Sequence, residues 1–177
     1  MSCVGTEVPT ATWRWRRALV IGYGSPIRGD DALGPLAADY LAAQDLPAGV
    51  EVVSRHILTA DLVPDIAAAD LVIFIDAAIE GTPGEIHCQR LTPNPEAVST
   101  MAHFLDPREL LAWAATLYDR EPESYLVSAP GESFDFAGYE LTASARRALQ
   151  VALSEVDRLL KAPCREASRG RNSTVDP

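Results

Sequence analysis

Cysteine is scarce in this sequence, and its spacing argues against two structural roles. The chain has three cysteines, Cys3, Cys88 and Cys164, and no CxxC pair. An odd number of widely spaced cysteines argues against a disulfide framework and against a thiolate zinc site. Cys88 has no obvious base beside it, so catalysis by a thiolate has little support. This cysteine usage fits a reducing compartment, and we expect a cytoplasmic protein.

Basic residues are outnumbered, and long apolar runs are absent. Fifteen Lys and Arg stand against 25 Asp and Glu, which gives a net charge of −10. This charge argues against nucleic acid or an anionic membrane as the main partner. The apolar run Ala18–Ile21 follows Arg14, Arg16 and Arg17, but it is too short for a signal peptide or a membrane span. We therefore expect no nucleic-acid and no membrane partner.

Two common enzyme motifs are missing as well. No serine lies in a GxSxG elbow. Gly22 and Gly24 begin a GxGxxG pattern, but the third glycine position holds Ile27. Asp30 and Asp31 follow where a pyrophosphate would lie, and their charge would repel it. The two glycines are therefore interpreted as forming a tight turn.

Length and composition predict one domain with a hydrophobic core. The chain has 177 residues, of which 47% are hydrophobic, and this suffices for a single core. Residues 1–16 are interpreted as an N-terminal extension and residues 17–161 as a single α/β domain. Residues 162–177 hold almost no large apolar side chain, so we expect a flexible tail there.

Apolar runs and turn residues predict the element order βαβαββαβα. The expected strands cover residues 18–21, 50–54, 71–75, 85–91 and 124–129. The expected helices begin at Leu33, at a Thr59 cap, at an Asp106 cap followed by Pro107, and at Thr142. Residues 77–84 are too few for a parallel crossover, so the strand at 85–91 should run antiparallel at an edge. We predict an α/β fold, a three-layer α/β/α sandwich around a twisted, mostly parallel five-stranded sheet with one antiparallel edge strand.

Helical spacing also predicts which side chains face the core, because a buried stripe recurs every three or four residues. In the first helix the expected stripe is Leu33, Leu36, Ala37, Tyr40 and Leu41. In the third helix it is Leu110, Leu111, Ala114, Leu117 and Tyr118.

Three carboxylates follow predicted strands. Asp30 and Asp31 lie between the first strand and its helix, and Asp76 ends the apolar run LVIFI. Ligands bind at the carboxyl edge of an open α/β sheet. If the first and third strands are neighbours, Asp31 and Asp76 flank one crevice and need a cation or a proton between them. The alternative for Asp30 and Asp31 is stabilisation of the helix start, at about 0.3 to 1 kcal/mol each.

An imidazole could complete a metal site with these acids. His103 lies in a long loop before the third helix, and His56 follows the second strand as a competing ligand. Carboxylate and imidazole ligands suit Ni, Zn, Mn or Fe, and three protein ligands leave coordination positions open. The alternative for His103 is an exposed side chain without a ligand role. His87, in the expected edge strand, is interpreted as structural.

Three segments of the chain match motifs of one known family. The first is Gly22–Gly34, GYGSPIRGDDALG, and the second is IFIDAA with Asp76, followed by Pro83 and Gly84. The third is Ser99–His103, STMAH, which precedes a helix. In this order the segments resemble the hydrogenase maturation proteases, and the resemblance covers roughly residues 18–160.

This resemblance implies an activity, a partner and a site. Members of the family are endopeptidases, classified as aspartic-type, that remove the C-terminal extension of a nickel-iron hydrogenase large-subunit precursor after nickel insertion. The family's metal-binding positions correspond to Asp31, Asp76 and His103, and Asp31 and Asp76 are also the expected catalytic residues. The nickel is expected to be carried by the precursor and recognised there.

The chain departs from the family pattern at two places. Ser25 stands where an Asn is usual, and Arg55–Thr59 replaces a Gly-Gly-Thr segment. These departures leave open which hydrogenase is processed and whether His56 joins the site. Two other functions stay open, a non-proteolytic nickel-binding assembly factor with the same ligands and a small-molecule metallohydrolase that carries its own zinc.

Overall fold

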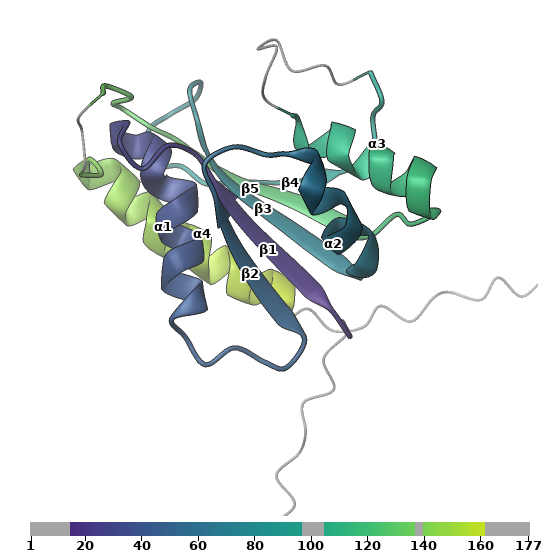
Figure 1. Ribbon diagram of the computed structural model, residues 1–177. Coiled ribbons are helices and arrows are strands. Elements are labelled where there is room, and N and C mark those ends of the chain that lie inside the picture. Colours follow the sequence, from purple (N-terminus) through teal and green to yellow (C-terminus); the bar gives the residue numbers. More distant parts are fainter. Residues whose placement is uncertain (1–14, 97–104, 137–139, 162–177) are drawn as a thin grey trace, which may run out of the picture.

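The strands and α-helices follow one another along the chain in the predicted order βαβαββαβα (Figure 1). The computed structural model describes residues 15–96, 105–136 and 140–161. Most of the expected N-terminal extension, the expected tail and His103 lie outside the described residues. The strands are β1 (Ala18–Tyr23), β2 (Val50–Arg55), β3 (Leu71–Ala78), β4 (His87–Leu91) and β5 (Glu123–Pro130). The α-helices are α1 (Leu33–Ala42), α2 (Val63–Ala68), α3 (Pro107–Tyr118) and α4 (Ala143–Leu160), with 3-10 turns η1 (Gly29–Ala32) and η2 (Ala60–Leu62).

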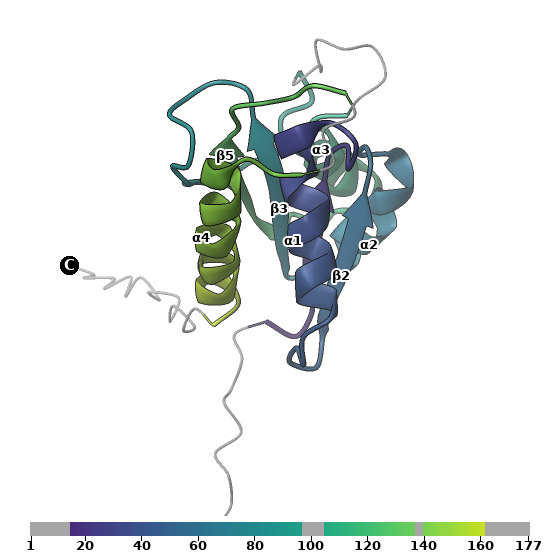
Figure 2. The ribbon, with the colours of Figure 1, turned by 90° about the vertical axis from the view of Figure 1, so that its left-hand side faces the viewer.

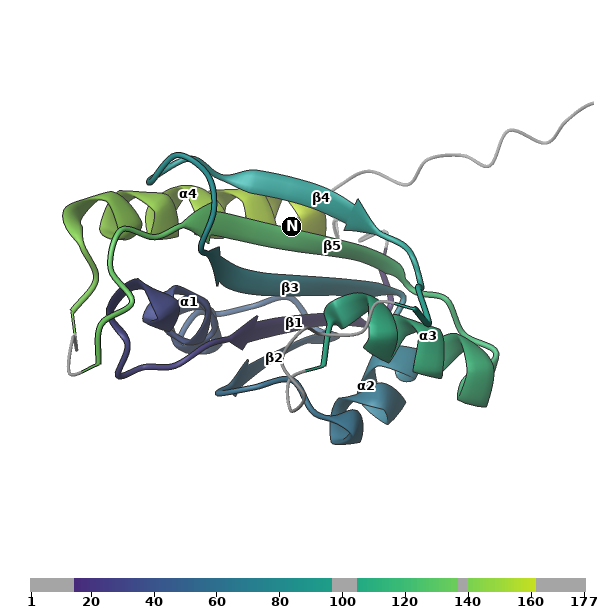
Figure 3. The ribbon, with the colours of Figure 1, turned by 90° about the horizontal axis from the view of Figure 1, so that it is seen from above.

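The strands form one sheet in the order β2-β1-β3-β5-β4. The pairs β1–β2, β1–β3 and β3–β5 are parallel, and β4 pairs antiparallel with β5 at the edge. Helices α1 and α4 pack together on one face, and α2 and α3 pack together on the other (Figures 2 and 3). The predicted three-layer sandwich and its antiparallel edge strand are therefore confirmed.

Alternating side chains of the inner strands build two cores. Along β3, Leu71, Ile73 and Ile75 join the core beneath α1 and α4, whereas Val72 and Phe74 join the core beneath α2 and α3. All five are fully buried, because successive strand residues point to opposite faces and both faces carry helices. Burial of each such side chain contributes about 1.5 to 3 kcal/mol.

The predicted buried face of α1 is correct at Leu33, Ala37 and Leu41 and wrong at Leu36 and Tyr40. Leu36 is 40% exposed and Tyr40 is 50% exposed, while Gly34, Ala37, Ala38 and Leu41 are buried. The helix lies so close to the sheet that a Cβ on Gly34 would come within 2.2 Å of the Tyr23 carbonyl oxygen. Only a residue without a Cβ permits this approach at position 34, so the small residues Gly34 and Ala38 face the sheet where a larger residue would not fit.

The predicted face of α3 is correct for its first turns and wrong at its end. Leu110, Leu111 and Ala114 are buried, but Leu117 and Tyr118 are largely exposed. The buried residues of this helix end at Ala114, so its last turn lies beyond the core.

Two of the three predicted helix caps are present, those of Asp106 and Thr142. The Asp106 carboxylate accepts a hydrogen bond from the Arg108 N–H at 2.7 Å, and the Thr142 hydroxyl accepts one from the Ala145 N–H at 3.2 Å. Thr59 precedes η2 but caps nothing, because its hydroxyl donates to the Asp61 carboxylate instead. Pro64 lies in the first turn of α2, as expected.

Within residues 15–96, 105–136 and 140–161, no helix is both long and apolar enough to cross a membrane.

Candidate active site

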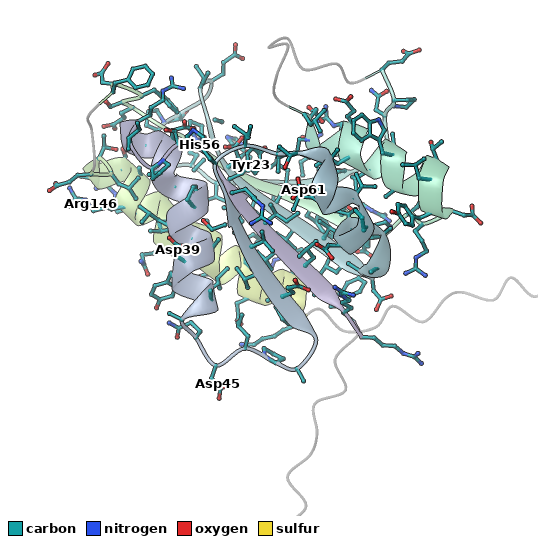
Figure 4. All side chains as sticks on the ribbon, viewed as in Figure 1. Tyr23, Asp39, Asp45, His56, Asp61 and Arg146 are labelled. Carbon is teal, nitrogen blue, oxygen red and sulfur yellow. The ribbon has the colours of Figure 1, made fainter. Side chains whose placement is uncertain are left out.

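A cleft of about 230 Å³ opens at the carboxyl ends of β1 and β3. Its polar lining includes Asp31, Asp76, His56 and Tyr23. Because β1 and β3 are neighbours, the acids that follow them meet at one edge of the sheet, as predicted. Figure 4 shows Tyr23 and His56 near the same end of the sheet.

Asp31 is presented by the 3-10 turn η1 and is partly exposed to the cleft. Its Oδ2 accepts a hydrogen bond from the Ser25 N–H at 3.1 Å and lies 3.7 Å from the Arg28 guanidinium. Gly24 makes this turn possible, because its φ is +136° and a Cβ there would come within 2.1 Å of the Asp31 carbonyl oxygen. The glycine therefore shapes the turn that presents Asp31.

Asp76 extends from β3, and its carboxyl is held in a low-dielectric setting. Burial, together with a smaller contribution from the negative charge of Asp31, raises the pKa of Asp76 to about 7. The Tyr23 hydroxyl and the Ala77 N–H, which lies 2.8 Å from Oδ1, donate hydrogen bonds that partly oppose this rise in pKa. The Asp76 carboxyl therefore exchanges its proton near neutral pH.

Tyr23 is a site residue that the sequence did not reveal. It ends β1 between the two turn glycines, and its hydroxyl donates to the Asp76 carboxylate. Burial raises its pKa well above the usual value, and the charges of Asp76, Asp106 and Asp31 act in the same direction. The hydroxyl therefore stays protonated and remains a donor. The position of Tyr23 at the end of the first strand, where ligands bind in this type of sheet, is the sequence signal that could have identified it as a site residue.

Asp30, the neighbour of Asp31, does not line the cleft. It is fully buried and accepts hydrogen bonds from the N–H groups of Glu132, Ser133 and Thr142 and from the Thr142 hydroxyl, at 2.7 to 3.3 Å. Burial alone would raise the pKa of Asp30, but these hydrogen bonds outweigh it and lower the pKa. Asp30 thus fastens η1 to the loop that follows β5.

The three histidines of the chain differ in their placement. His56 lines the cleft, His87 is exposed on the edge strand β4, and His103 lies outside the described residues. Among the residues that the structure describes, no three His, Cys, Asp or Glu side chains are grouped closely enough to hold a metal ion. The three-ligand site with Asp31, Asp76 and His103 stays a prediction.

Arg28 is a second residue that the sequence did not reveal. It lines the cleft between Asp31 and the Phe136 ring, and its guanidinium carbon lies 5.2 Å from the ring centroid. Its Nε is buried and has no hydrogen-bond partner in the described part of the chain. Arg28 therefore brings a positive charge to a cleft that otherwise holds two carboxylates.

A second hollow lies away from this site. It measures about 620 Å³ and lies between the C-terminal parts of α1 and α4, where its lining includes Tyr40, Asp45 and Asp157. None of the predicted site residues lines it.

Several solved structures share this fold over most of the chain. The hydrogenase maturation protease HycI from Thermococcus kodakarensis is 28% identical, with a TM-score of 0.66 over 83% of this chain and 94% of that one. The hydrogenase maturating endopeptidase HybD from E. coli is 25% identical, with a TM-score of 0.69 over 82% of this chain and 92% of that one. A hydrogenase 2 maturation peptidase from a Thaumarchaeota archaeon is 27% identical, with a TM-score of 0.60 over 81% and 97%.

No protein-family model and no curated protein matches the sequence. The solved structures nevertheless share the fold of this chain and are named hydrogenase maturation proteases or peptidases. They confirm that this chain resembles the hydrogenase maturation proteases.

Proposed function

We propose that this chain is a hydrogenase maturation endopeptidase. It removes the C-terminal extension of a nickel-iron hydrogenase large-subunit precursor after nickel has been inserted. The observation that carries this proposal is that Asp31 and Asp76 line one cleft at the carboxyl edge of β1 and β3. The solved structures with the same fold are named hydrogenase maturation peptidases, which supports the same reaction here. The cytoplasm is the proposed compartment.

In this proposal nickel belongs to the substrate, and the cleft recognises it. Asp31, Asp76 and His103 are the proposed ligands, and His56 is a second candidate imidazole. Two carboxylates that share a cleft repel each other, so a divalent cation between them relieves that repulsion. Carboxylate and imidazole groups are suitable ligands for nickel. The cleft thereby distinguishes a nickel-loaded precursor from an empty one.

Nickel binding also positions the reaction. A precursor held by its metal brings the adjoining peptide bond beside Asp76, and this converts the reaction into an effectively intramolecular one. Water attacks the scissile carbonyl carbon and passes a proton to the Asp76 carboxylate. The tetrahedral intermediate then breaks its C–N bond, and the proton moves to the departing amine. The pKa of Asp76 is about 7 before nickel binds. The charge of the bound nickel would lower this pKa, so Asp76 would be ionised and able to accept the proton of the water. An aspartic-type classification is part of the proposal.

The test is to incubate the purified protein with the nickel-loaded precursor and to measure the mass of the large subunit. The wild-type protein should shorten it by the mass of the extension, and Asp31→Ala and Asp76→Ala should not. Asp39→Ala, on the exposed surface of α1 (Figure 4), is the matched control. Undiminished processing by both site variants would overturn the proposed site.

The same experiment separates the two alternative functions. A non-proteolytic assembly factor would bind the nickel-loaded precursor and leave its mass unchanged. A small-molecule metallohydrolase would carry zinc in stoichiometric amount after purification, which elemental analysis detects.

A further inference from the structure

Three large apolar side chains are exposed on loops at the edge of the sheet that holds the cleft. Ile27, Ile79 and Phe136 expose 43%, 79% and 76% of their surface. They lie in three different loops, which follow β1, β3 and β5. Because these strands are adjacent and parallel, their loops meet at one edge of the sheet. We call Ile27, Ile79 and Phe136 the apolar rim.

Two members of the apolar rim are linked to the cleft, and Ile27 precedes the cleft residue Arg28 in the sequence. Ile79 lines the cleft itself, and Phe136 is joined to it through the Arg28 guanidinium. Further inside, the lining continues with Leu58, Leu105 and Phe134. Single exposed apolar side chains are ordinary on protein surfaces, but a group of them around a cleft is typical of a binding site.

Backbone hydrogen bonds hold the loops of the rim in place. The Asp30 N–H donates to the Ser133 carbonyl at 2.8 Å, which joins the loop after β1 to the loop after β5. The Gly131 N–H donates to the Ala78 carbonyl at 2.9 Å, which joins the loop after β5 to the end of β3. A surface whose loops are already fixed loses less conformational entropy when a ligand binds.

We propose that the apolar rim binds the segment of the precursor next to the scissile bond, an extended peptide with large apolar side chains. This inference rests on the proposed function. The charge of the cleft favours one kind of ligand. Asp31 and Asp76 repel an acidic peptide segment, and they attract a segment that carries a bound cation. A metal-loaded precursor with apolar residues beside its metal complements both the two acids and the rim.

The rim can be tested with Ile27→Ser, Ile79→Ser, Phe136→Ser and the triple variant. Leu117→Ser and Val151→Ser are matched controls, because these exposed side chains lie on α3 and α4. All five positions are exposed, so each variant should keep the wild-type melting temperature. For cleavage of the nickel-loaded precursor, we expect KM to rise by about tenfold for each rim variant, since burying a large apolar side chain is worth at least that factor. The value of kcat should change little, because the rim contacts neither the metal nor the scissile bond.

A change in the substrate tests the contact from the other side. Replacing the large apolar residues next to the cleavage point of the precursor with Ser should raise KM for the wild-type protein. It should add little to the KM of the triple variant, because a contact that is already lost cannot be lost again. Independent, additive effects would overturn the proposed contact.

Binding of a fluorescent peptide that copies the precursor around its cleavage point separates the two proposals. Peptide binding that is weakened by the rim variants, without any cleavage of the precursor, would support the rim and contradict the protease. Cleavage with a KM for the triple variant equal to that of the wild type would support the protease and overturn the rim.

Discussion

The Tyr23 hydroxyl donates a hydrogen bond to the Asp76 carboxylate, and this pair joins the ends of two neighbouring strands at the cleft. A hydrogen bond to the charged form of a carboxyl favours that form. Tyr23 therefore keeps the pKa of Asp76 lower than burial alone would set it.

Removing the Tyr23 hydroxyl should raise the pKa of Asp76. In Tyr23→Phe the carboxylate loses a donor while its burial and the charge of Asp31 remain, so we expect the pKa to rise above about 7. NMR titration of the Asp76 carboxyl carbon measures the shift directly. Tyr118→Phe, on the exposed end of α3, is the control. An unchanged or lower pKa in Tyr23→Phe would contradict the assigned hydrogen bond.

The buried Asp76 should make the folded protein less stable as pH rises. Its pKa is about 7 in the folded state and about 3.8 as the ordinary value, so the native state binds the extra proton between these pH values. Stability is therefore lost as pH rises from about 4 to 7 and stays lower above this range. Asp76→Asn should remove this contribution and be more stable than wild type at pH 8 by up to about 4 kcal/mol, because the folded-state pKa lies about three units above the ordinary value and each unit corresponds to about 1.36 kcal/mol.

Urea denaturation at acidic and alkaline pH measures this effect. The difference in unfolding free energy between wild type and Asp76→Asn should widen as pH rises, whereas the difference for the exposed Asp39→Asn should not. A difference that stays constant with pH would show that Asp76 titrates normally.

Loss of the Asp30 carboxylate should destabilise the fold without removing a group from the cleft. Asp30→Ala leaves the N–H groups of Glu132, Ser133 and Thr142 without their acceptor. These hydrogen bonds are part-buried, so water replaces the acceptor in part and the cost per donor stays below that of a fully buried group, about 1 to 3 kcal/mol. We expect a loss of about 2 to 4 kcal/mol in urea denaturation at pH 7. Because the pKa of Asp30 is lowered, wild type should lose this stabilisation in acid, and Asp30→Ala should not. A variant as stable as Asp39→Ala would exclude this role.

Gly34→Ala tests the close packing of α1 on the sheet. Helix propensity alone predicts that this change stabilises a helix by about 1 kcal/mol. A Cβ at this position would lie 2.2 Å from the Tyr23 carbonyl oxygen and 2.5 Å from that of Ile75. We therefore expect destabilisation by about 1 to 3 kcal/mol, as is typical of overpacking. Thermal melting gives the sign, and a gain in stability would contradict the packing.

The fold could be predicted because its determinants are local. The apolar runs at β1 and β3, the cap at Asp106 and the short link before β4 each depend on a few neighbouring residues. Asp31 and Asp76 could be placed together for the same reason, since each follows a strand and parallel strands end at one edge. The fold and the placement of Asp31 and Asp76 could therefore be predicted without knowing how the side chains pack.

Other features depend on contacts that no local pattern contains. The face of α1 is set by the approach of Gly34 to the sheet, which spacing alone does not show. The Tyr23 contact with Asp76 and the Arg28 contact with Phe136 join residues far apart in sequence. The fourfold hydrogen bonding of Asp30 likewise appears only once the loop after β5 is in place.

In the proposed function, the cleft binds the nickel of the precursor before the peptide bond is cleaved. The most direct measurement is a mass-spectrometric time course with nickel-loaded and nickel-free precursor, using wild type, Asp31→Ala, Asp76→Ala and His103→Ala. We expect wild type to shorten only the nickel-loaded precursor and the three variants to shorten neither precursor. Cleavage of nickel-free precursor at the wild-type rate, or full activity of Asp31→Ala and Asp76→Ala, would contradict it.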